Sequence, residues 1–156
     1  MEHNKFKGFT LIELLVVISI IGLLSTLAMV ALNNARIRSR DATRLSNMKT
    51  LQTAMEMYYD VGKTYAGACK DGTGASLTPP QQINTCVGSA GSTGLDDFLP
   101  NIANLKDPNG TGACANPATA ACNYALNAAS ATSFTANFWQ EGTDGAGLVN
   151  EGGLIP

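Results

Sequence analysis

The chain of 156 residues is short of charged and aromatic side chains. Charged residues make up 14% of it and aromatic residues 6%, with one tryptophan and one histidine, His3. A chain this short forms about one domain, which excludes a large multidomain enzyme. The formal charge of −2 and the pI of about 5.2 also argue against a protein that binds nucleic acid by neutralising phosphates.

The apolar residues are concentrated near the N-terminus. From Leu14 to Leu32 nineteen successive positions carry no charge, and between Phe9 and Leu32 only Glu13 does. A helix of about 24 residues is roughly 36 Å long, whereas the hydrocarbon core of a bilayer is about 30 Å thick. The segment therefore predicts a helix that crosses a membrane.

A secretory signal peptide and the buried helix of a soluble protein are the competing interpretations. Signal peptides have a shorter apolar region that ends in a small-x-small cleavage site, and Ala28 to Ala31 offers only a poor one. A buried helix of this length needs partners on every face, which so small and polar a domain cannot supply. We therefore favour a membrane anchor.

Four cysteines, Cys69, Cys86, Cys114 and Cys122, lie in the polar remainder. None has the C-x-x-C spacing of a metal site, and no histidine beyond His3 could complete a ligand set. We favour two disulfides over four reduced thiols, and proximity in sequence favours Cys69 with Cys86 and Cys114 with Cys122. Because disulfides persist outside the cytoplasm, we expect the C-terminal domain there, although basic residues flank the apolar segment on both sides.

The first residues carry a specific resemblance. Lys5-Phe6-Lys7-Gly8 followed by Phe9-Thr10-Leu11-Ile12-Glu13-Leu14-Leu15-Val16-Val17-Ile18 resembles the leader and mature N-terminus of the type IV pilin family, which includes the pseudopilins of type II secretion. The resemblance implies that a prepilin peptidase cuts after Gly8 and that Phe9 becomes the N-methylated first residue. Since cleavage would also remove His3, we expect no enzymatic activity, and neither a metal nor a cofactor.

Glu13 is the unusual residue of the apolar segment. A carboxylate in hydrocarbon costs a few kcal/mol, so an ionisable group there indicates a function. We expect its partner to be the α-amino group of Phe9 on a neighbouring subunit, whose charge exists only after cleavage. The alternative is that Glu13 lies near the interface and favours the positive end of its helix, worth about 0.3–1 kcal/mol.

The resemblance implies a structural subunit that polymerises into a type IV pilus for adhesion, motility or DNA uptake. The partners would be copies of itself, the prepilin peptidase, an inner-membrane assembly platform with a separate ATPase, and membrane lipid before assembly. The chain would cross the membrane once before assembly and lie in a cell-surface filament afterwards. The alternatives are the major pseudopilin of a type II secretion system and a membrane-anchored binding protein that never polymerises.

Hydrophobic positions continue beyond the apolar segment at three- and four-residue steps, which predicts that the helix continues as an amphipathic one. We predict one helix from Phe9 to about Tyr59 after a leader of residues 1–8. Residues 9–32 form its membrane half, residues 33–60 form its amphipathic half, and residues 61–156 form a head. Gly62 is the predicted left-handed cap. The amphipathic pattern comprises Leu45, Met48, Leu51, Met55 and Tyr58.

Strand patterns in the head complete the predicted fold. Asn123 to Leu126 and Ser133 to Trp139 predict two strands joined by a small-residue turn, Leu148 to Val149 a faint third, and Leu95 to Leu105 a short helical turn. The sequence thus predicts an α+β protein, similar to type IV pilins. In this fold a long N-terminal helix packs against a small antiparallel sheet, and disulfides cross-link the head.

Two further polar features are candidate binding sites. Arg36, Arg38, Arg40 and Arg44 follow the apolar segment, and we expect them to pair with lipid headgroups or with acidic faces of neighbouring subunits, DNA being the alternative. The run from Glu141 to Gly147 offers oxygen ligands for calcium. It does not match an EF-hand loop, and we interpret it as a solvated glycine-rich turn.

Overall fold

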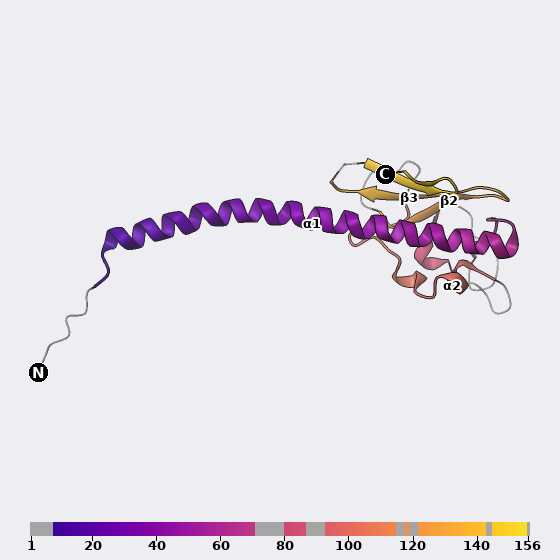
Figure 1. Ribbon diagram of the computed structural model, residues 1–156, viewed down its shortest axis with the longest axis horizontal. Helices are drawn as coiled ribbons and strands as arrows, with labels where there is room; N and C mark the ends of the chain where they lie inside the picture. The colour runs from indigo at the N-terminus through magenta and orange to yellow at the C-terminus, as the bar shows by residue number, and fades with distance from the viewer. Residues whose placement is uncertain are drawn as a thin grey trace, which may run out of the picture. The chain divides into compact units, whose positions relative to one another are not determined.

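The computed structural model describes residues 8–70, 80–86, 93–114, 118, 122–142 and 145–155. It comprises two compact units, the first ending at Arg36 and the second beginning at Ile37. Helix α1 (Leu11–Gly62) contributes to both units. Within the described residues, the second unit also holds a five-stranded sheet and three short helical segments (Figure 1).

The first unit consists of the N-terminal part of α1 and the residues before it. All of its described side chains are exposed, and the large apolar ones range from Leu11, 88% exposed, to Val17, 46% exposed. In length and composition α1 is able to cross a membrane. The predicted helix is confirmed, although its first helical residue is Leu11 rather than Phe9.

The second-unit part of α1 is amphipathic, as the spacing of its apolar residues predicts. Met48, Leu51, Met55 and Tyr58 are buried, whereas Lys49 on the other face is exposed. This alternation turns one stripe of the helix toward the core of the head and leaves the other stripe in contact with solvent.

The prediction that Gly62 caps the helix in a left-handed conformation is wrong. Gly62 is the last residue of α1, and Lys63 takes the positive φ, 54°. The N–H of Lys63 donates to the carbonyl of Tyr59 at 2.6 Å, which is the bond that closes an αL cap. The helix therefore ends at the glycine itself, and the next residue, a lysine, occupies the left-handed position that usually favours glycine.

The sheet is antiparallel throughout, in the order β1-β2-β3-β4-β5. The predicted strands correspond to β2, β3 and β4, with boundaries shifted by one to three residues. β1 and β5 have no counterpart in the prediction because two or three residues are too few for alternation to be recognised. The bounds are β1 (Gln81–Gln82), β2 (Ala125–Ala129), β3 (Phe134–Gln140), β4 (Gly145–Asn150) and β5 (Gly153–Ile155).

The predicted helical turn between Leu95 and Leu105 consists of two pieces, α2 (Leu95–Phe98) and the 3-10 helix η2 (Ile102–Asn104). A further 3-10 helix, η1 (Ile83–Thr85), follows β1. Leu95, Ile102 and Ile83 are buried in the same core as α1. These short segments therefore complete the core on the face of α1 that the sheet does not cover (Figure 1).

Alternate residues of β3 face the two sides of the sheet. Phe134, Ala136 and Phe138 join the main core beneath α1, where Phe134 contacts the ring of Tyr65 at a centroid distance of 5.0 Å. On the other side, Trp139 packs against a smaller cluster around Cys114, Ala118, Cys122 and Ala125. The head thus has a helix-facing core and a thin outer layer, and the predicted α+β, pilin-like fold is confirmed.

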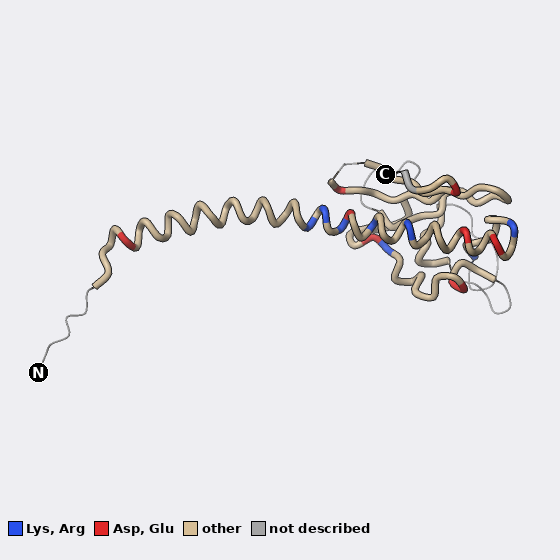
Figure 2. Tube along the Cα trace, in the orientation of Figure 1, with Lys and Arg blue, Asp and Glu red and all other residues tan. Residues whose placement is uncertain are grey.

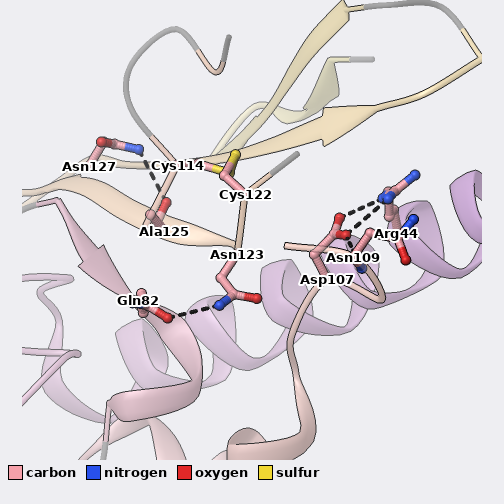
Figure 3. Close-up of a disulfide and its surroundings, with 9 residues drawn as sticks. All are labelled: Arg44, Gln82, Asp107, Asn109, Cys114, Cys122, Asn123, Ala125 and Asn127. Carbon is pink, nitrogen blue, oxygen red and sulfur yellow. Dashed lines mark hydrogen bonds and ion pairs between the residues drawn. A yellow bond between two sulfur atoms is a disulfide. The ribbon is translucent and has the colours of Figure 1, made fainter. Parts of the chain in front are cut away.

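Disulfides join Cys69 to Cys86 and Cys114 to Cys122, the pairing that proximity in sequence favours. The second bridge closes a loop that two backbone bonds also hold. The Cys114 N–H donates to the Asn123 carbonyl at 2.9 Å, and the Asn123 N–H donates to the Gly112 carbonyl at 2.8 Å. Cys114 and Cys122 thus lie close together (Figure 3) and pack with Ala125 and Trp139 in the smaller cluster on the outer side of the sheet.

A glycine in β4 allows an aromatic ring to lie flat on the sheet. Gly147 is paired with Phe138 across the β3–β4 ladder, and a Cβ built on Gly147 would collide with the far edge of the Phe138 ring. Phe138 is fully buried in the main core. A side chain at position 147 would therefore displace a core residue.

We expect Gly147→Ala to destabilise the head by about 1–3 kcal/mol, because the added methyl group overpacks the core at Phe138. Urea unfolding of the detergent-solubilised chain, followed by Trp139 fluorescence, measures the loss. Gly62→Ala is the matched control, since its Cβ would meet nothing nearer than the Thr64 methyl group at 3.9 Å. Equal midpoints for the two variants would contradict the close packing of Phe138 on Gly147.

Candidate functional site

The predicted site residues Phe9 and Glu13 lie at the start of α1. Together with Ile12, Val16 and Val17 they line one surface hollow of about 370 Å³. Gly8, on the other side of the predicted cleavage bond, is exposed, and a Cβ built on it would meet no atom within 4 Å. The peptide bond between Gly8 and Phe9 is thus open to a protease, and the acidic side chain lies one turn away from it.

Glu13 and Thr10 form a capping box. One oxygen of the Glu13 carboxylate, Oε2, accepts hydrogen bonds from the Thr10 N–H at 2.8 Å and from the Thr10 hydroxyl at 2.7 Å. The Glu13 N–H donates in turn to the Thr10 hydroxyl oxygen at 3.3 Å. This role of Thr10 was not predicted, although the T-x-x-E spacing before an apolar run is its recognised sequence signal.

The capping box determines where the carboxylate lies. It ties Glu13 to the first turn of α1, next to the backbone of the residue that follows Phe9. A carboxylate has about four lone-pair sites, and Thr10 uses one oxygen only. Glu13 can therefore remain bound to its own helix and still accept a second donor from outside.

The charges of α1 are confined to its ends and its second half. In Figure 2 an acidic position lies near the start of the helix, a long stretch with neither acidic nor basic residues follows, and basic positions come next. The sequence identifies the acidic residue as Glu13 and the first basic one as Arg36. A helix that carries charge only beyond a membrane-length interval has its polar groups where the two bilayer surfaces would lie.

The four arginines after the apolar segment do not act as one group. Arg36 and Arg38 are exposed, but Arg44 is completely buried and Arg40 is half-buried. Arg40 binds Glu141 through its Nε, at 3.0 Å, and through a terminal nitrogen. The prediction that Arg40 and Arg44 face lipid headgroups or neighbouring subunits is therefore wrong, because both are paired within the head.

Arg44 is the centre of a buried ion cluster. Its Nε and one terminal nitrogen bind both oxygens of Asp107, and its two terminal nitrogens also bind Asp41 at 2.7 Å and Glu141 at 2.6 Å. The side chains of Arg44 and Asp107 are both fully inaccessible to solvent. Figure 3 shows the Asp107 carboxylate directed at the guanidinium group from a loop that is distant in sequence.

The same cluster holds the turn between β3 and β4 on α1. Asp41 accepts hydrogen bonds from the backbone N–H groups of Glu141 at 3.0 Å and Gly142 at 2.8 Å. Asn109, two residues after Asp107, donates a hydrogen bond from its side-chain amide to the Glu141 carboxylate at 3.2 Å. Three parts of the chain that lie far apart in sequence thus meet at one charged point.

The charges in this cluster stabilise one another. Burial alone would lower the pKa of Arg44, but hydrogen bonds to Asp107, Glu141 and Asp41 outweigh it and raise the pKa above its ordinary value. Hydrogen bonds from Arg40 lower the pKa of Glu141 to about 2. Partial burial opposes this shift, and hydrogen bonds from Arg44 reinforce it. Partial burial opposes the ionised form of Asp41, yet the N–H groups of Glu141 and Gly142 lower its pKa.

Glu141 is also the first residue of the run considered for calcium. Its carboxylate is bound by two guanidinium groups, so it is not a free oxygen ligand. Positions 143 and 144 of the run lie outside the described residues. In the described part of the chain, no group of three or more acidic, histidine or cysteine side chains is arranged to hold a metal ion.

Comparison with known proteins points to pilins. A family model described as the prokaryotic N-terminal methylation motif matches residues 3–29. The chain is 32% identical over 100 residues to a probable minor fimbrial protein of Dichelobacter nodosus, covering 61% of this chain and 63% of that protein. It is 37% identical over 89 residues to the type IV major fimbrial protein FimA of the same organism, covering 56% of each.

A third relative is the type IV major pilin protein PilA of Myxococcus xanthus strain DK1622. The identity is 33% over 64 residues, covering 41% of this chain and 29% of PilA. The matches therefore span less than two thirds of the length of these relatives. No solved structure matches the chain significantly.

We expect Arg44→Met to destabilise the head by about 3–5 kcal/mol, because it leaves Asp107 buried without its cation. Chemical unfolding of the solubilised chain measures the loss. Arg38→Met is the control, since an exposed arginine should change stability by no more than about 0.5 kcal/mol. The double variant Arg44→Met/Asp107→Leu removes both buried charges and should recover part of the loss. A single Arg44→Met variant as stable as Arg38→Met would refute the role of the cluster.

Acid should weaken the head through Glu141. The unfolded carboxyl titrates near its ordinary value of 4.5 and the folded one near about 2, so between these values the unfolded chain binds more protons. The contribution of Glu141 is therefore fully present above pH 4.5 and is lost as the pH falls toward about 2. Melting temperatures measured across this range should fall less steeply for Glu141→Gln than for the exposed control Asp60→Asn. Identical slopes would contradict the assignment.

Proposed function

We propose that the chain is the precursor of a structural filament subunit, a type IV pilin, because residues 3–29 match the N-terminal methylation motif and the named relatives are fimbrial proteins and a pilin. Residues 1–8 are the leader, residues 9–32 the membrane and polymerisation half of the helix, residues 33–60 its amphipathic half, and residues 61–156 the head. The observation that carries the proposal is an acidic residue held at the start of an otherwise uncharged apolar stretch, residues 9–32, whose large side chains are all exposed.

The first step is processing at the membrane surface. A prepilin peptidase cuts between Gly8 and Phe9, and the new α-amino group of Phe9 is methylated. Support comes from the match to the N-terminal methylation motif over residues 3–29 and from the exposure of Gly8 and Phe9. Before assembly, the helix lies in lipid as a membrane anchor, which accounts for its exposed apolar side chains.

The second step is assembly. The cationic amine of Phe9 on one copy pairs with Glu13 of its neighbour, which neutralises a carboxylate that would otherwise be costly in an apolar surrounding. The other carboxylate oxygen of Glu13 can accept a hydrogen bond from this amine while Oε2 stays bound to Thr10. Because the amine does not exist before cleavage, unprocessed chains cannot complete the pair.

The third step is growth of a surface filament. Copies of the chain bury their apolar helices against one another, driven by a separate assembly ATPase on an inner-membrane platform, while the heads cover the outside. The named relatives are fimbrial proteins and a pilin, which supports a pilus used for adhesion, motility or DNA uptake. The relatives are structural proteins, which also supports a role other than catalysis.

Substituting Glu13→Ala tests the pairing step. We expect normal cleavage and methylation, seen in the intact mass of the membrane form, and a fall of more than about tenfold in fibres recovered by shearing, because the neighbour's amine loses its partner. Asp60→Ala, which removes a carboxylate that is 82% exposed on the same helix, should leave the fibres unchanged.

The outcomes of electron microscopy separate the three candidate functions. Long fibres at natural expression identify a pilus, fibres only on overexpression identify a secretion pseudopilus, and no fibres at all identify a binding protein that stays anchored. Normal fibres from the Glu13→Ala variant would overturn the pairing step. A surface form whose mass still includes Met1 would overturn processing.

A further inference from the structure

A surface hollow on the first unit combines apolar and polar groups. Its volume is about 410 Å³, and it lies at the end of the uncharged stretch of α1. Three of its side chains are apolar, two are amides and one is a guanidinium group. The residues that line it are Met29, Val30, Leu32, Asn33, Asn34 and Arg36.

Arg36 is the cation of this hollow. It is exposed, and within the part of the chain that the structure describes it makes no ion pair, whereas Arg40 and Arg44 are both bound by carboxylates. Asn33 is three positions before Arg36, so both side chains lie on the same face of the helix. Figure 2 places the first arginines directly after the uncharged stretch.

The length of the helix places this hollow at a defined depth. If Phe9 lies at one bilayer surface, Arg36 follows it by 27 residues, or roughly 40 Å of helix, and a bilayer with its headgroups is about 40–45 Å thick. Arg36 is about 6 Å beyond Leu32, the last residue of the uncharged stretch. The guanidinium group therefore lies in the headgroup layer while Met29 and Leu32 still contact acyl chains.

We propose that this hollow binds the phosphate of an anionic phospholipid and so fixes the depth of the unassembled subunit in the membrane. Arg36 supplies a planar fork of donors that matches phosphate oxygens, and the amide of Asn33 supplies a further donor. Met29, Val30 and Leu32 form the apolar floor for the glycerol and first methylene groups. This inference rests on the membrane stage of the proposed function.

The test uses the full chain in lipid nanodiscs that contain phosphatidylglycerol and phosphatidylcholine. The lipids that remain bound after extraction are quantified by mass spectrometry. We expect about fivefold enrichment of phosphatidylglycerol for the natural chain, from one basic residue at the surface, and loss of this enrichment for Arg36→Gln. Arg38→Gln is the matched control, because Arg38 is equally charged and exposed but does not line the hollow. It should retain the enrichment.

Other outcomes overturn the inference. Equal losses for Arg36→Gln and Arg38→Gln would indicate diffuse attraction to the surface rather than a site. Displacement of the lipid by inorganic phosphate would identify the free anion as the ligand. Unchanged lipid enrichment together with lost fibres in Arg36→Gln would identify an acidic side chain of a second copy as the partner.

Extraction by alkaline carbonate distinguishes a failure of the lipid site from a failure of the proposed membrane stage. If the chain resists extraction and shows no lipid preference, the lipid site is wrong and the membrane stage stands. If carbonate releases the chain, the membrane stage itself is wrong and the lipid site falls with it.

Discussion

The apolar side chains at the start of α1 require a non-aqueous partner. From Phe9 to Leu32 they are all exposed, so the described part of the chain offers them no cover. In the proposed function, lipid before assembly and other copies of the helix after assembly would both satisfy this requirement. In the proposed filament, Glu13, the single acidic group of residues 9–32, would limit which copies can pack together, because its carboxylate needs a cation wherever water is excluded.

The head satisfies a different constraint, which is to hold a small, polar domain on one helix. Its large apolar residues are few, and they are arranged in a single core around Met48, Leu51 and Phe138. The Arg44 cluster complements this core at the start of the second unit, where Asp107 and Glu141 arrive from distant segments. A buried ion cluster is a weak source of net stability but penalises any arrangement that separates its members. It therefore contributes to the specificity of the fold.

The long helix, three of the strands and both disulfides were predictable because each depends on local pattern. Apolar periodicity over many residues defines α1, and close spacing favours the pairing of Cys69 with Cys86. The motif singled out Glu13 as a candidate residue, and its bond to Thr10 could have been predicted from the T-x-x-E spacing. The short edge strands β1 and β5 were not predictable, since two or three residues carry no measurable alternation.

Sequence by itself determined that the chain has an apolar, membrane-length helix with one acidic residue near its start, because hydrophobicity and helical period act along the chain. Only the tertiary structure decided which of the arginines are exposed and which are buried. Arg38 and Arg44 have the same charge and nearly the same place in the sequence, yet one is exposed and the other is fully buried against Asp107. The difference arises because a buried cation depends on carboxylates brought to it by folding, and no local pattern records which distant residues will arrive.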